Sequence, residues 1–409
     1  MSAAGVLRAP GAVLFGWGAL EAAGPRVAEL GDRVLICTDR AVIGTEAGRA
    51  LREGLDAAGL AVAVFEETAP ELPRDNVEAA LAAARRDEVE VVVGFGGGSA
   101  IDIAKVTALR LRAEGEIEDF VGENRVPAAV APVVAVPTTA GTGSEVSPVA
   151  VVSDREGKLK VGISSPWLVP AVAICDPAAT LTCPPGVTAH SGIDALFHAV
   201  ESYTARPIEP DWSDHPGPIF RGSNALTAPL ALSAIELISG ALEPVLADGG
   251  DRQAREDMLR GALQAGLSFA QAGNAGAHAL QYPIGARTKT PHGLGIGLLG
   301  PYVLQYVLPE AGASLAAVGR ALGVGADPEA AVTELSRLVA VAGIPASLAE
   351  LGIEQAELGG LAAEAASIER LLRNSPRTLR EPDLKLILEA AWSGDRALLK
   401  EPPDVRVDP

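Results

Sequence analysis

The first third of the chain alternates between short, continuously apolar runs and longer amphipathic stretches. Apolar runs rich in β-branched residues are typical of strands buried on both faces, and amphipathic stretches are typical of the helices that cover them. Three strand and helix pairs are predicted in this way: 33–38 with a helix ending at Ala58, 61–66 with Asn76–Arg86, and 90–95 with Ser99–Leu111. The pattern predicts a parallel, Rossmann-like sheet of the nucleotide-binding type.

The second half of the chain has a different pattern. VAVVSD at 149–154 and KLKVGI at 158–163 still predict a β-hairpin, but from Thr188 onward only helical periods and loops appear. The predicted helices are Ala225–Leu246, Arg255–Ala272, Pro309–Leu322, Ala330–Ala342 and Asp383–Trp392. Because the alternation stops near DPAATLTCPPG, we predict an α/β domain over 1–184 and an all-α domain over 185–409.

Two segments are predicted to lack regular structure. Arg206–Gly222 is a long stretch rich in Pro, Asp and Gly, which is typical of a functional or disordered loop. The tail EPPDVRVDP is predicted to be a loose end.

Charge and cysteine content restrict the partners and the compartment. The chain carries 52 acidic against 33 basic residues, a net charge of -19, which should repel both nucleic acid and an anionic membrane surface. Its three cysteines form no C-x-x-C motif, so neither a disulfide framework nor a thiolate metal site is indicated. The N-terminus has no signal-like pattern, and the longest apolar run, 126–137, is broken by prolines. We expect a cytoplasmic protein without a nucleic-acid or membrane partner.

All five histidines lie between His190 and His292, and three of them join one aspartate in a pattern suited to a divalent metal. Asp194 and His198 are four residues apart on a helical pattern, so they project from one face. His278 is expected on a helix and His292 in the Pro-Gly loop after it. One carboxylate and three imidazoles suit Fe(II) or Zn(II) and leave room for a substrate oxygen.

A structural interpretation of these residues is also open. Ser191 and Asp194 have the spacing of a capping box, so Asp194 could instead close a helix N-terminus. A single histidine beside Leu196 and Phe197, as His198 is, can also be a core residue.

The third predicted strand runs into GFGGGSAIDIAK, and this loop is a candidate phosphate site. Glycines at Gly97 and Gly98, followed by Ser99 at a helix start, would let backbone N–H groups approach a pyrophosphate. Ser99 and Asp102 have the spacing of a capping box, which would fix where the helix begins. The loop is not the GxGxxG fingerprint, and an ordinary glycine turn is the alternative.

Other candidate cofactor ligands follow further strands. Asp39 comes directly after the first strand, where it could bind an adenosine ribose and favour NAD over NADP, or simply occupy a solvated turn. Lys160 in the hairpin could bind an anion or a ribose, or lie on the surface. VVAVPTTAGTGSEVSP at 133–148 is predicted to be a strand that opens into a loop. The loop offers hydroxyls for phosphate or nicotinamide contacts, with a polar turn as the alternative: Thr138, Thr139, Thr142 and Ser144.

Four motifs together resemble the iron-containing, group III alcohol dehydrogenases, in that family's order and spacing. They are GGGSAIDIAK (96–105), PTTAGTGSEVS (137–147), GIDALFHAVESY (192–203) and PHG (291–293). The resemblance implies a dehydroquinate synthase-like architecture, NAD(P) in the N-terminal domain, a metal in the cleft and a homodimer. It implies as metal ligands Asp194, His198, His278 and His292. It implies as cofactor contacts Gly97, Gly98, Ser99, Thr138, Thr139 and Lys160, with Asp39 at the adenosine ribose.

One position departs from the family pattern. Where many members carry a further histidine four residues after the third ligand, this chain has Tyr282, which could bond to the substrate or pack. Tyr282 and its neighbouring motifs are similar to the hydroxyacid-oxoacid transhydrogenase branch, which implies short-chain hydroxy acids. Three arginines near the site in sequence could bind a carboxylate or be solvated: Arg206, Arg221 and Arg287.

The sequence therefore predicts a metal-dependent oxidoreductase. It would transfer a hydride between NAD and a small alcohol or hydroxy acid, or an aldehyde or ketone in reverse, with the substrate oxygen bound to Fe(II). The alternative is a hydroxyacid-oxoacid transhydrogenase that retains its nicotinamide cofactor.

Overall fold

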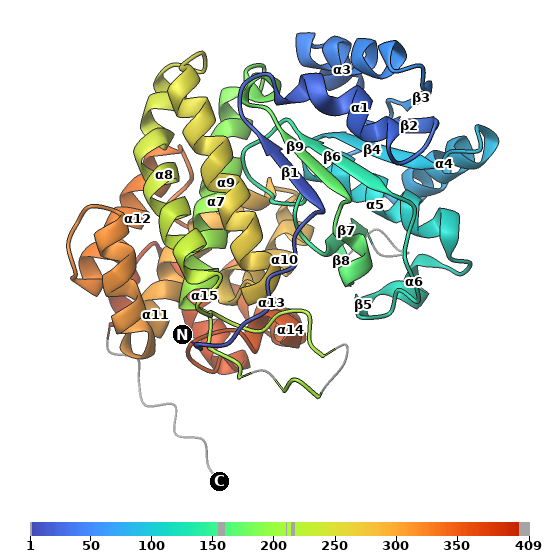
Figure 1. Ribbon diagram of the computed structural model, residues 1–409. Coiled ribbons are helices and arrows are strands. Elements are labelled where there is room, and N and C mark those ends of the chain that lie inside the picture. The colour runs from blue at the N-terminus through green and yellow to red at the C-terminus, as the bar shows by residue number, and fades with distance from the viewer. Residues whose placement is uncertain (1, 154–159, 210, 214–216, 401–409) are drawn as a thin grey trace.

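A parallel β-sheet and a bundle of helices lie side by side in the computed structural model (Figure 1), which describes residues 2–153, 160–209, 211–213 and 217–400. The sheet belongs to the N-terminal half of the chain and the bundle to the C-terminal half. The predicted loose tail at 401–409 lies outside the described residues.

The main sheet has six parallel strands in the order β1-β9-β6-β4-β2-β3. Its strands are β1 (Ala12–Phe15), β2 (Arg33–Cys37), β3 (Ala61–Phe65), β4 (Val91–Gly96), β6 (Val133–Pro137) and β9 (Val172–Cys175). The central strands β4 and β6 are buried along their whole length, as the continuous apolar runs predicted. The parallel sheet is therefore confirmed, while β1 and β9, four residues each, were not predicted.

Helices cover both faces of the sheet because successive strand residues point to opposite sides. In β2, Leu35 packs in one cluster with α4 (Arg74–Arg86) and α5 (Gly98–Arg112). Its neighbour Ile36 packs in another cluster with α3 (Glu46–Ala57). The helix predicted to end at Ala58 is in fact two helices. The first, α2 (Arg40–Ile43), ends at Ile43, and Thr45 caps the N-terminus of the second, α3. Two further short helices are α1 (Ala23–Ala28) and α6 (Ile117–Phe120).

The predicted hairpin is present beside the main sheet. β7 (Val149–Ser153) and β8 (Lys160–Ser164) are antiparallel, with Ser153 opposite Lys160, and β5 (Gly122–Glu123) pairs with β8. The turn at 154–159 lies outside the described residues. This small sheet holds Lys160 toward the helical half of the molecule.

In the C-terminal half, every regular element of the described residues is helical, as predicted. The helices are α7 (Pro185–Thr204), α8 (Ala228–Ala247), α9 (Arg252–Ala272), α10 (Gly276–Thr288), α11 (His292–Ala321), α12 (Pro328–Val341), α13 (Leu358–Ala366), α14 (Glu369–Leu372) and α15 (Glu381–Ser393). They enclose one large apolar core. The expectation of a loop at His292 is wrong: this residue is the first of α11, a helix predicted only from Pro309 onward. The glycines of HGLGIGLLG conceal its helical period.

Within the described residues, α8 alone is long and apolar enough to cross a membrane. A core helix of a globular protein passes the same test of length and composition. Because Ile235, Ile238 and Leu242 of α8 are fully buried in the helical core, we describe α8 as a core helix.

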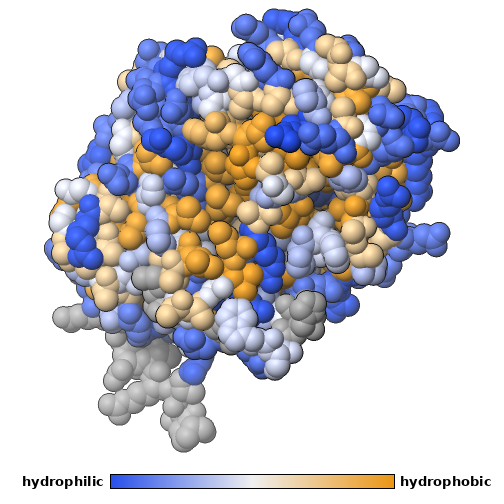
Figure 2. All heavy atoms as spheres, in the orientation of Figure 1, coloured by the Kyte–Doolittle hydropathy of each residue, from blue (hydrophilic) through white to orange (hydrophobic). Residues whose placement is uncertain are grey.

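Figure 2 shows where apolar side chains reach the surface of the face seen in Figure 1. They gather along the boundary between the sheet and the helices, whereas hydrophilic residues dominate the outer rims of both halves. The edge strand β1 lies on this boundary, and its residues Val13 and Phe15 are only partly buried.

Candidate functional site

Helix α7 places Asp194 and His198 side by side in the interior of the molecule. The helix begins at Pro185, so Asp194 lies in its middle and the alternative of a capping box with Ser191 is wrong. The two residues are 4% and 5% exposed, and Asp194 Oδ1 lies 3.6 Å from His198 Nε2. The ring of His198 stacks on Phe269 of α9 with centroids 4.4 Å apart, which fixes its orientation.

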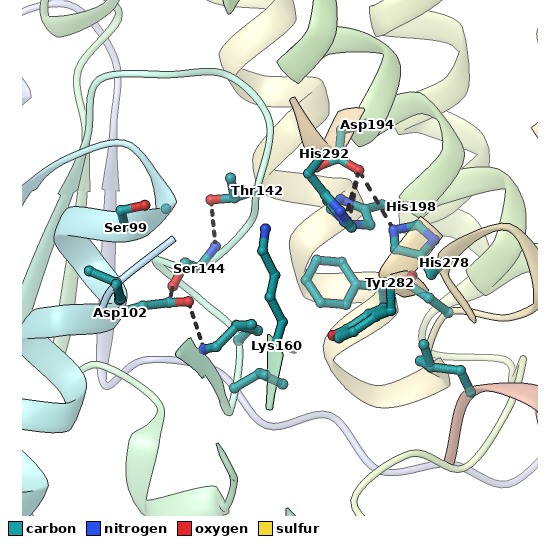
Figure 3. Close-up of a pocket in the computed structure, with 18 of the residues that line it drawn as sticks. Ser99, Asp102, Thr142, Ser144, Lys160, Asp194, His198, His278, Tyr282 and His292 are labelled. Atoms are coloured by element: carbon teal, nitrogen blue, oxygen red, sulfur yellow. Dashed lines mark hydrogen bonds and ion pairs between the residues drawn. The ribbon is translucent and has the colours of Figure 1, made fainter. Parts of the chain in front are cut away.

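Two other helices bring the remaining histidines to the same carboxylate. Asp194 Oδ1 lies 3.6 Å from Nε2 of His278 on α10 and 4.0 Å from Nε2 of His292 at the start of α11. Ligand atoms of these three residues all lie within 4.8 Å of one another. His198 completes the group, since its ring centroid is 4.8 Å from that of His278. The four residues chosen from the sequence are thus brought together (Figure 3).

The electrostatics of this cluster suit a cation. Three buried atoms in it have no hydrogen-bond partner: Asp194 Oδ1, His198 Nδ1 and His278 Nε2. Burial lowers the pKa of His198 to about 4 and that of His292 to about 3, so both imidazoles are neutral near pH 7. Burial alone would raise the pKa of Asp194, but the surrounding imidazoles reverse this and hold it well below its usual value. The Asp194 carboxylate with these two neutral imidazoles already offers three ligands of the kind that Fe(II) or Zn(II) binds.

Glu201, which was not predicted from the sequence, contacts the ring nitrogen of His278 that faces away from Asp194. It is 2% exposed, and its Oε2 lies 2.6 Å from His278 Nδ1. Its carboxylate also accepts the backbone N–H groups of Ala275 and Ala277. Burial would lower the pKa of His278, but Glu201 and Asp194 outweigh it and raise that pKa to about 9. The spacing of Glu201, seven residues after Asp194 on the same helix face, was a usable signal.

The glycine-rich loop opens onto the same region from the sheet side. Helix α5 begins at Gly98, within one residue of the prediction, and its N-cap Gly97 supplies no side-chain cap. The predicted capping box of Ser99 and Asp102 is wrong: the Asp102 carboxylate accepts bonds from the Ser144 hydroxyl and, at 2.9 Å, from the N–H of Val151. The first N–H groups of α5 are therefore left without a side-chain acceptor.

The loop after β6 packs between the two halves, and its glycines are needed for that. A Cβ at Gly141 would lie 2.5 Å from Ser191 Cβ on α7. Gly143, with φ of 62°, would place a Cβ 2.6 Å from the Cα of Gly266 on α9. These contacts fix Thr142 and Ser144 beside the start of α5.

A cavity of about 290 Å³ joins the two sides of the site. Ten predicted site residues line it: Gly98, Ser99, Thr142, Ser144, Lys160, Asp194, His198, His278, Tyr282 and His292. Figure 3 shows Lys160 and Tyr282 between Ser99 on one side and the histidines on the other. Four predicted residues do not line this cavity: Asp39, Gly97, Thr138 and Thr139. The candidate nucleotide and metal sites therefore face one common space.

The four residues outside the cavity have other contacts. Asp39 caps α2, accepting the N–H groups of Ala41 and Val42 at 2.9 Å. Thr139 lies beside Gly97, where a Cβ would meet its side chain at 3.4 Å, and Thr138 is buried next to the end of β4.

The three arginines suggested by sequence do not line the cavity. Arg206 bonds to Thr378, Arg287 pairs with Glu357, and Arg221 is buried elsewhere. A different arginine, Arg370 of α14, lines it instead, and it is far from the other site residues in sequence.

A parallel sheet whose glycine loop faces a carboxylate and three imidazoles is the arrangement of a metal-dependent, nucleotide-linked oxidoreductase. Comparisons identify the family. The model of iron-containing alcohol dehydrogenase matches residues 10–177, and that of the C-terminal part of the Fe-containing alcohol dehydrogenase family matches residues 218–392.

Individual relatives match over nearly the whole chain. Long-chain-alcohol dehydrogenase 1 of Geobacillus thermodenitrificans is 38% identical over 93% of this chain and 94% of its own. The NAD-dependent methanol dehydrogenase of Bacillus methanolicus is 31% identical over 93% of this chain and 98% of its own. A crystal structure of 1,3-propanediol oxidoreductase superposes with a TM-score of 0.88 at 30% identity, covering 95% of this chain and all of that one (100%).

The chain belongs to the iron-containing alcohol dehydrogenase family and is an oxidoreductase of that type. Its sheet and helical bundle are the fold of the family's solved structures. The family uses a metal, usually iron, and NAD. Nothing in these comparisons singles out the hydroxyacid-oxoacid transhydrogenase branch, which stays a prediction.

Proposed function

We propose that this protein oxidises a small alcohol or hydroxy acid with NAD, or reduces the matching aldehyde or ketone, in the cavity between its two halves. The observation that carries the proposal is that two features line one cavity: the N-terminus of α5, which no side chain caps, and the cluster of one carboxylate and three imidazoles. A nicotinamide held at one wall and a substrate oxygen held at the other would then be neighbours, which is what hydride transfer requires.

Asp194, His198, His278 and His292 would hold the metal. The buried Asp194 Oδ1 and His278 Nε2 have no hydrogen-bond partner, and the Nε2 atoms of the three histidines lie 3.6, 3.6 and 4.0 Å from Asp194 Oδ1, which fits ligands that share one cation. A bound Fe(II) or Zn(II) supplies Lewis acidity that brings the pKa of an alcohol toward neutrality. Glu201 orients His278 by accepting its Nδ1–H, which leaves Nε2 facing Asp194.

The cofactor would lie along the α5 side of the cavity. The first backbone N–H groups of α5, with Gly98 and Ser99, suit a pyrophosphate. The side chain of Thr142 lies close to Gly98 and lines the same cavity. Lys160 reaches the same space, and Tyr282 offers a phenol to the substrate. Thr138, Thr139 and Gly97 support this wall, and Asp39 at the end of β2 would meet the adenosine ribose and disfavour NADP.

The domain limits, 1–184 for the NAD-binding part and 185–409 for the metal-binding part, belong to this proposal. So do a cytoplasmic location and a homodimer. Sedimentation analysis of the purified chain would test the homodimer, and a monomer at micromolar concentration would contradict it.

A transhydrogenase is the second candidate, and Tyr282 in place of the usual histidine favours it. Such an enzyme would pass hydride from a hydroxy acid to an oxo acid on a retained nicotinamide. Turnover without added NAD, dependent on both acids, would support it.

The testing experiment is a turnover assay of protein loaded with Fe(II) under nitrogen, on a panel of short alcohols and hydroxy acids, with and without NAD. We expect NADH to form only when NAD is supplied. The matched variant Asp194→Asn should lose both metal and turnover, whereas Asp56→Asn in α3 should keep both. Full turnover by metal-free Asp194→Asn would contradict the proposal.

A further inference from the structure

Arg370 reaches the cavity between the two halves of the molecule. It lies on α14, and its Nη2 donates a 2.7 Å hydrogen bond to the hydroxyl of Tyr282 on α10. A Cβ at Gly162 on β8 would lie only 3.3 Å from the same nitrogen. The guanidinium group therefore occupies the space between α10 and β8, and a glycine at 162 leaves room for it.

The charge of Arg370 is not balanced by a neighbouring acid, unlike that of the other cations around this part of the cleft. Lys160 Nζ lies 2.9 Å from Glu71, and Arg373 Nη2 lies 2.6 Å from Glu123. Among the residues that the structure describes, no carboxylate lies within ion-pair distance of Arg370. Its one described side-chain hydrogen bond goes to a neutral phenol.

A guanidinium group has five N–H donors, so most of those on Arg370 are unused. An arginine with free donors in a partly enclosed cavity is suited to bind a carboxylate or a similar oxyanion. Apolar side chains of Phe269 and Leu371 line the same cavity and suit a short alkyl chain. The ligand that fits this wall is thus a small organic monoanion.

The contacts of Tyr282 indicate where that anion would lie in the substrate. The Tyr282 ring centroid is 6.4 Å from that of His292 and 5.6 Å from the Arg370 guanidinium carbon. The Tyr282 ring thus lies near the candidate metal ligand, while the hydroxyl at the tip of its side chain is bonded to Arg370. The anion would lie at the end of the substrate remote from the reacting alcohol.

We propose that Arg370, positioned by Tyr282, binds a terminal carboxylate or sulfonate, so that the site selects ω-hydroxy acids and their aldehydes over neutral alcohols. This inference rests on the proposed function, because it assumes that the alcohol end of the substrate meets the Asp194 cluster. It adds the chemical class of the substrate and the residue that recognises it.

The test compares matched charged and neutral substrates on the metal-loaded enzyme with NAD. The substrates are 4-hydroxybutanoate, 3-hydroxypropanesulfonate, 2-hydroxybutanoate and neutral 1,4-butanediol. We expect the wild type to prefer the two terminal anions over the diol and over the 2-hydroxy acid. In Arg370→Gln, kcat/KM for the terminal anions should fall about 10- to 100-fold, mainly through KM, while that for the diol changes little. Loss of only one of the two anions would identify the preferred headgroup.

Two further variants separate charge from structure. Arg370→Lys keeps the charge and should recover part of the preference for anions, whereas the matched control Arg373→Gln should leave it unchanged. Equal losses for the anions and the diol in Arg370→Gln would overturn the proposal. Turnover of the diol without any preference for anions would overturn this inference alone, whereas no NAD-linked turnover of any substrate would count against the proposed function.

A binding measurement tests Arg370 even if turnover is absent. Isothermal titration of the metal-loaded protein with pentanoate, which has no hydroxyl to oxidise, should give an affinity about 10-fold or more higher in the wild type than in Arg370→Gln. Equal affinity in the two proteins, with both shown to be folded by circular dichroism, would contradict recognition by Arg370.

Discussion

Glu201 Oε2 lies 2.6 Å from His278 Nδ1, inside a contact that is almost completely buried. The ring of a metal-binding histidine is often fixed by a carboxylate on its other nitrogen, and loss of that carboxylate typically weakens metal binding. Glu201 also accepts two backbone N–H groups at the start of α10, so it holds both the ring and the helix that carries it.

We therefore predict that Glu201→Gln lowers the affinity for Co(II) or Zn(II) by about 10- to 100-fold. The amide keeps the volume and can still accept one bond, but it lacks the charge that stabilises the orientation of His278. Equilibrium titration against a competing chelator measures this affinity without reference to turnover. Glu236→Gln on the exposed side of α8 is the matched control and should bind metal like the wild type. Unchanged affinity in Glu201→Gln would show that the contact is not needed for metal binding.

A second prediction concerns the close contact between Gly98 and Thr142. A Cβ at Gly98 would lie 2.8 Å from Thr142 Cγ2, so Gly98→Ala must displace the loop that faces the start of α5. We expect KM for NAD to rise about tenfold or more, with metal affinity unchanged.

The double variant Gly98→Ala with Thr142→Ser tests the cause of that change. Serine lacks the clashing Cγ2, so KM for NAD in the double variant should fall most of the way from the value of Gly98→Ala to that of the wild type. A rise in KM that the second substitution does not reduce would place the origin of the effect elsewhere, for example in the backbone of the glycine loop.

A third prediction addresses Asp39, whose role at the ribose was expected from sequence. Its carboxylate caps α2, so removing the side chain would confound a helix cap with a cofactor contact. Asp39→Asn keeps the cap and removes the charge. If Asp39 repels the 2′-phosphate of NADP, the ratio of kcat/KM for NADP to that for NAD should rise about fivefold or more.

The stability of Asp39→Asn serves as its control. Because asparagine caps helices about as well as aspartate, the free energy of unfolding should change by less than about 0.5 kcal/mol. An unchanged cofactor ratio in this folded variant would mean that Asp39 acts only as a cap.

The sequence predicted those parts of the molecule that depend on local pattern. Four strands of the main sheet, β2, β3, β4 and β6, follow from continuous apolar runs, and Asp194 and His198 follow from helical spacing. β9 was missed because VAIC is four residues long and is a strand only through its neighbours β1 and β6. Local pattern cannot show such pairing.

The site, too, could be predicted only where its residues follow a local sequence pattern. Motifs within one segment located the metal ligands and the glycine loop. Arg370 could not be found in this way, because it meets Tyr282 only after α14 has packed beside α10, 88 residues away in the chain. Ser99 and Asp102 show the opposite error, since their local spacing suggested a cap while Ser144, 42 residues from Asp102, is the actual partner of the carboxylate.

The last prediction uses Glu145, a 2% exposed carboxylate beneath the loop that carries Thr142 and Ser144. Burial raises its pKa from 4.5 to about 7, against the opposing charge of Lys105. Between those two pH values the folded protein binds more protons at Glu145 than the unfolded chain does. The stability contributed by this group is therefore fully present below about pH 4.5 and is lost as the pH rises through about 7.

Glu145→Gln removes the titrating group and should remove that part of the pH dependence. We expect the fall in unfolding free energy between pH 5 and pH 7.5, measured from urea denaturation, to be smaller in Glu145→Gln than in the wild type, by up to about 3 kcal/mol. The control is Glu53→Gln, because Glu53 lies exposed on α3 and the same substitution there should leave the pH dependence unchanged. If both variants keep the wild-type slope, then Glu145 is ionised in the folded protein at pH 5, and Lys105 compensates its charge more strongly than burial penalises it.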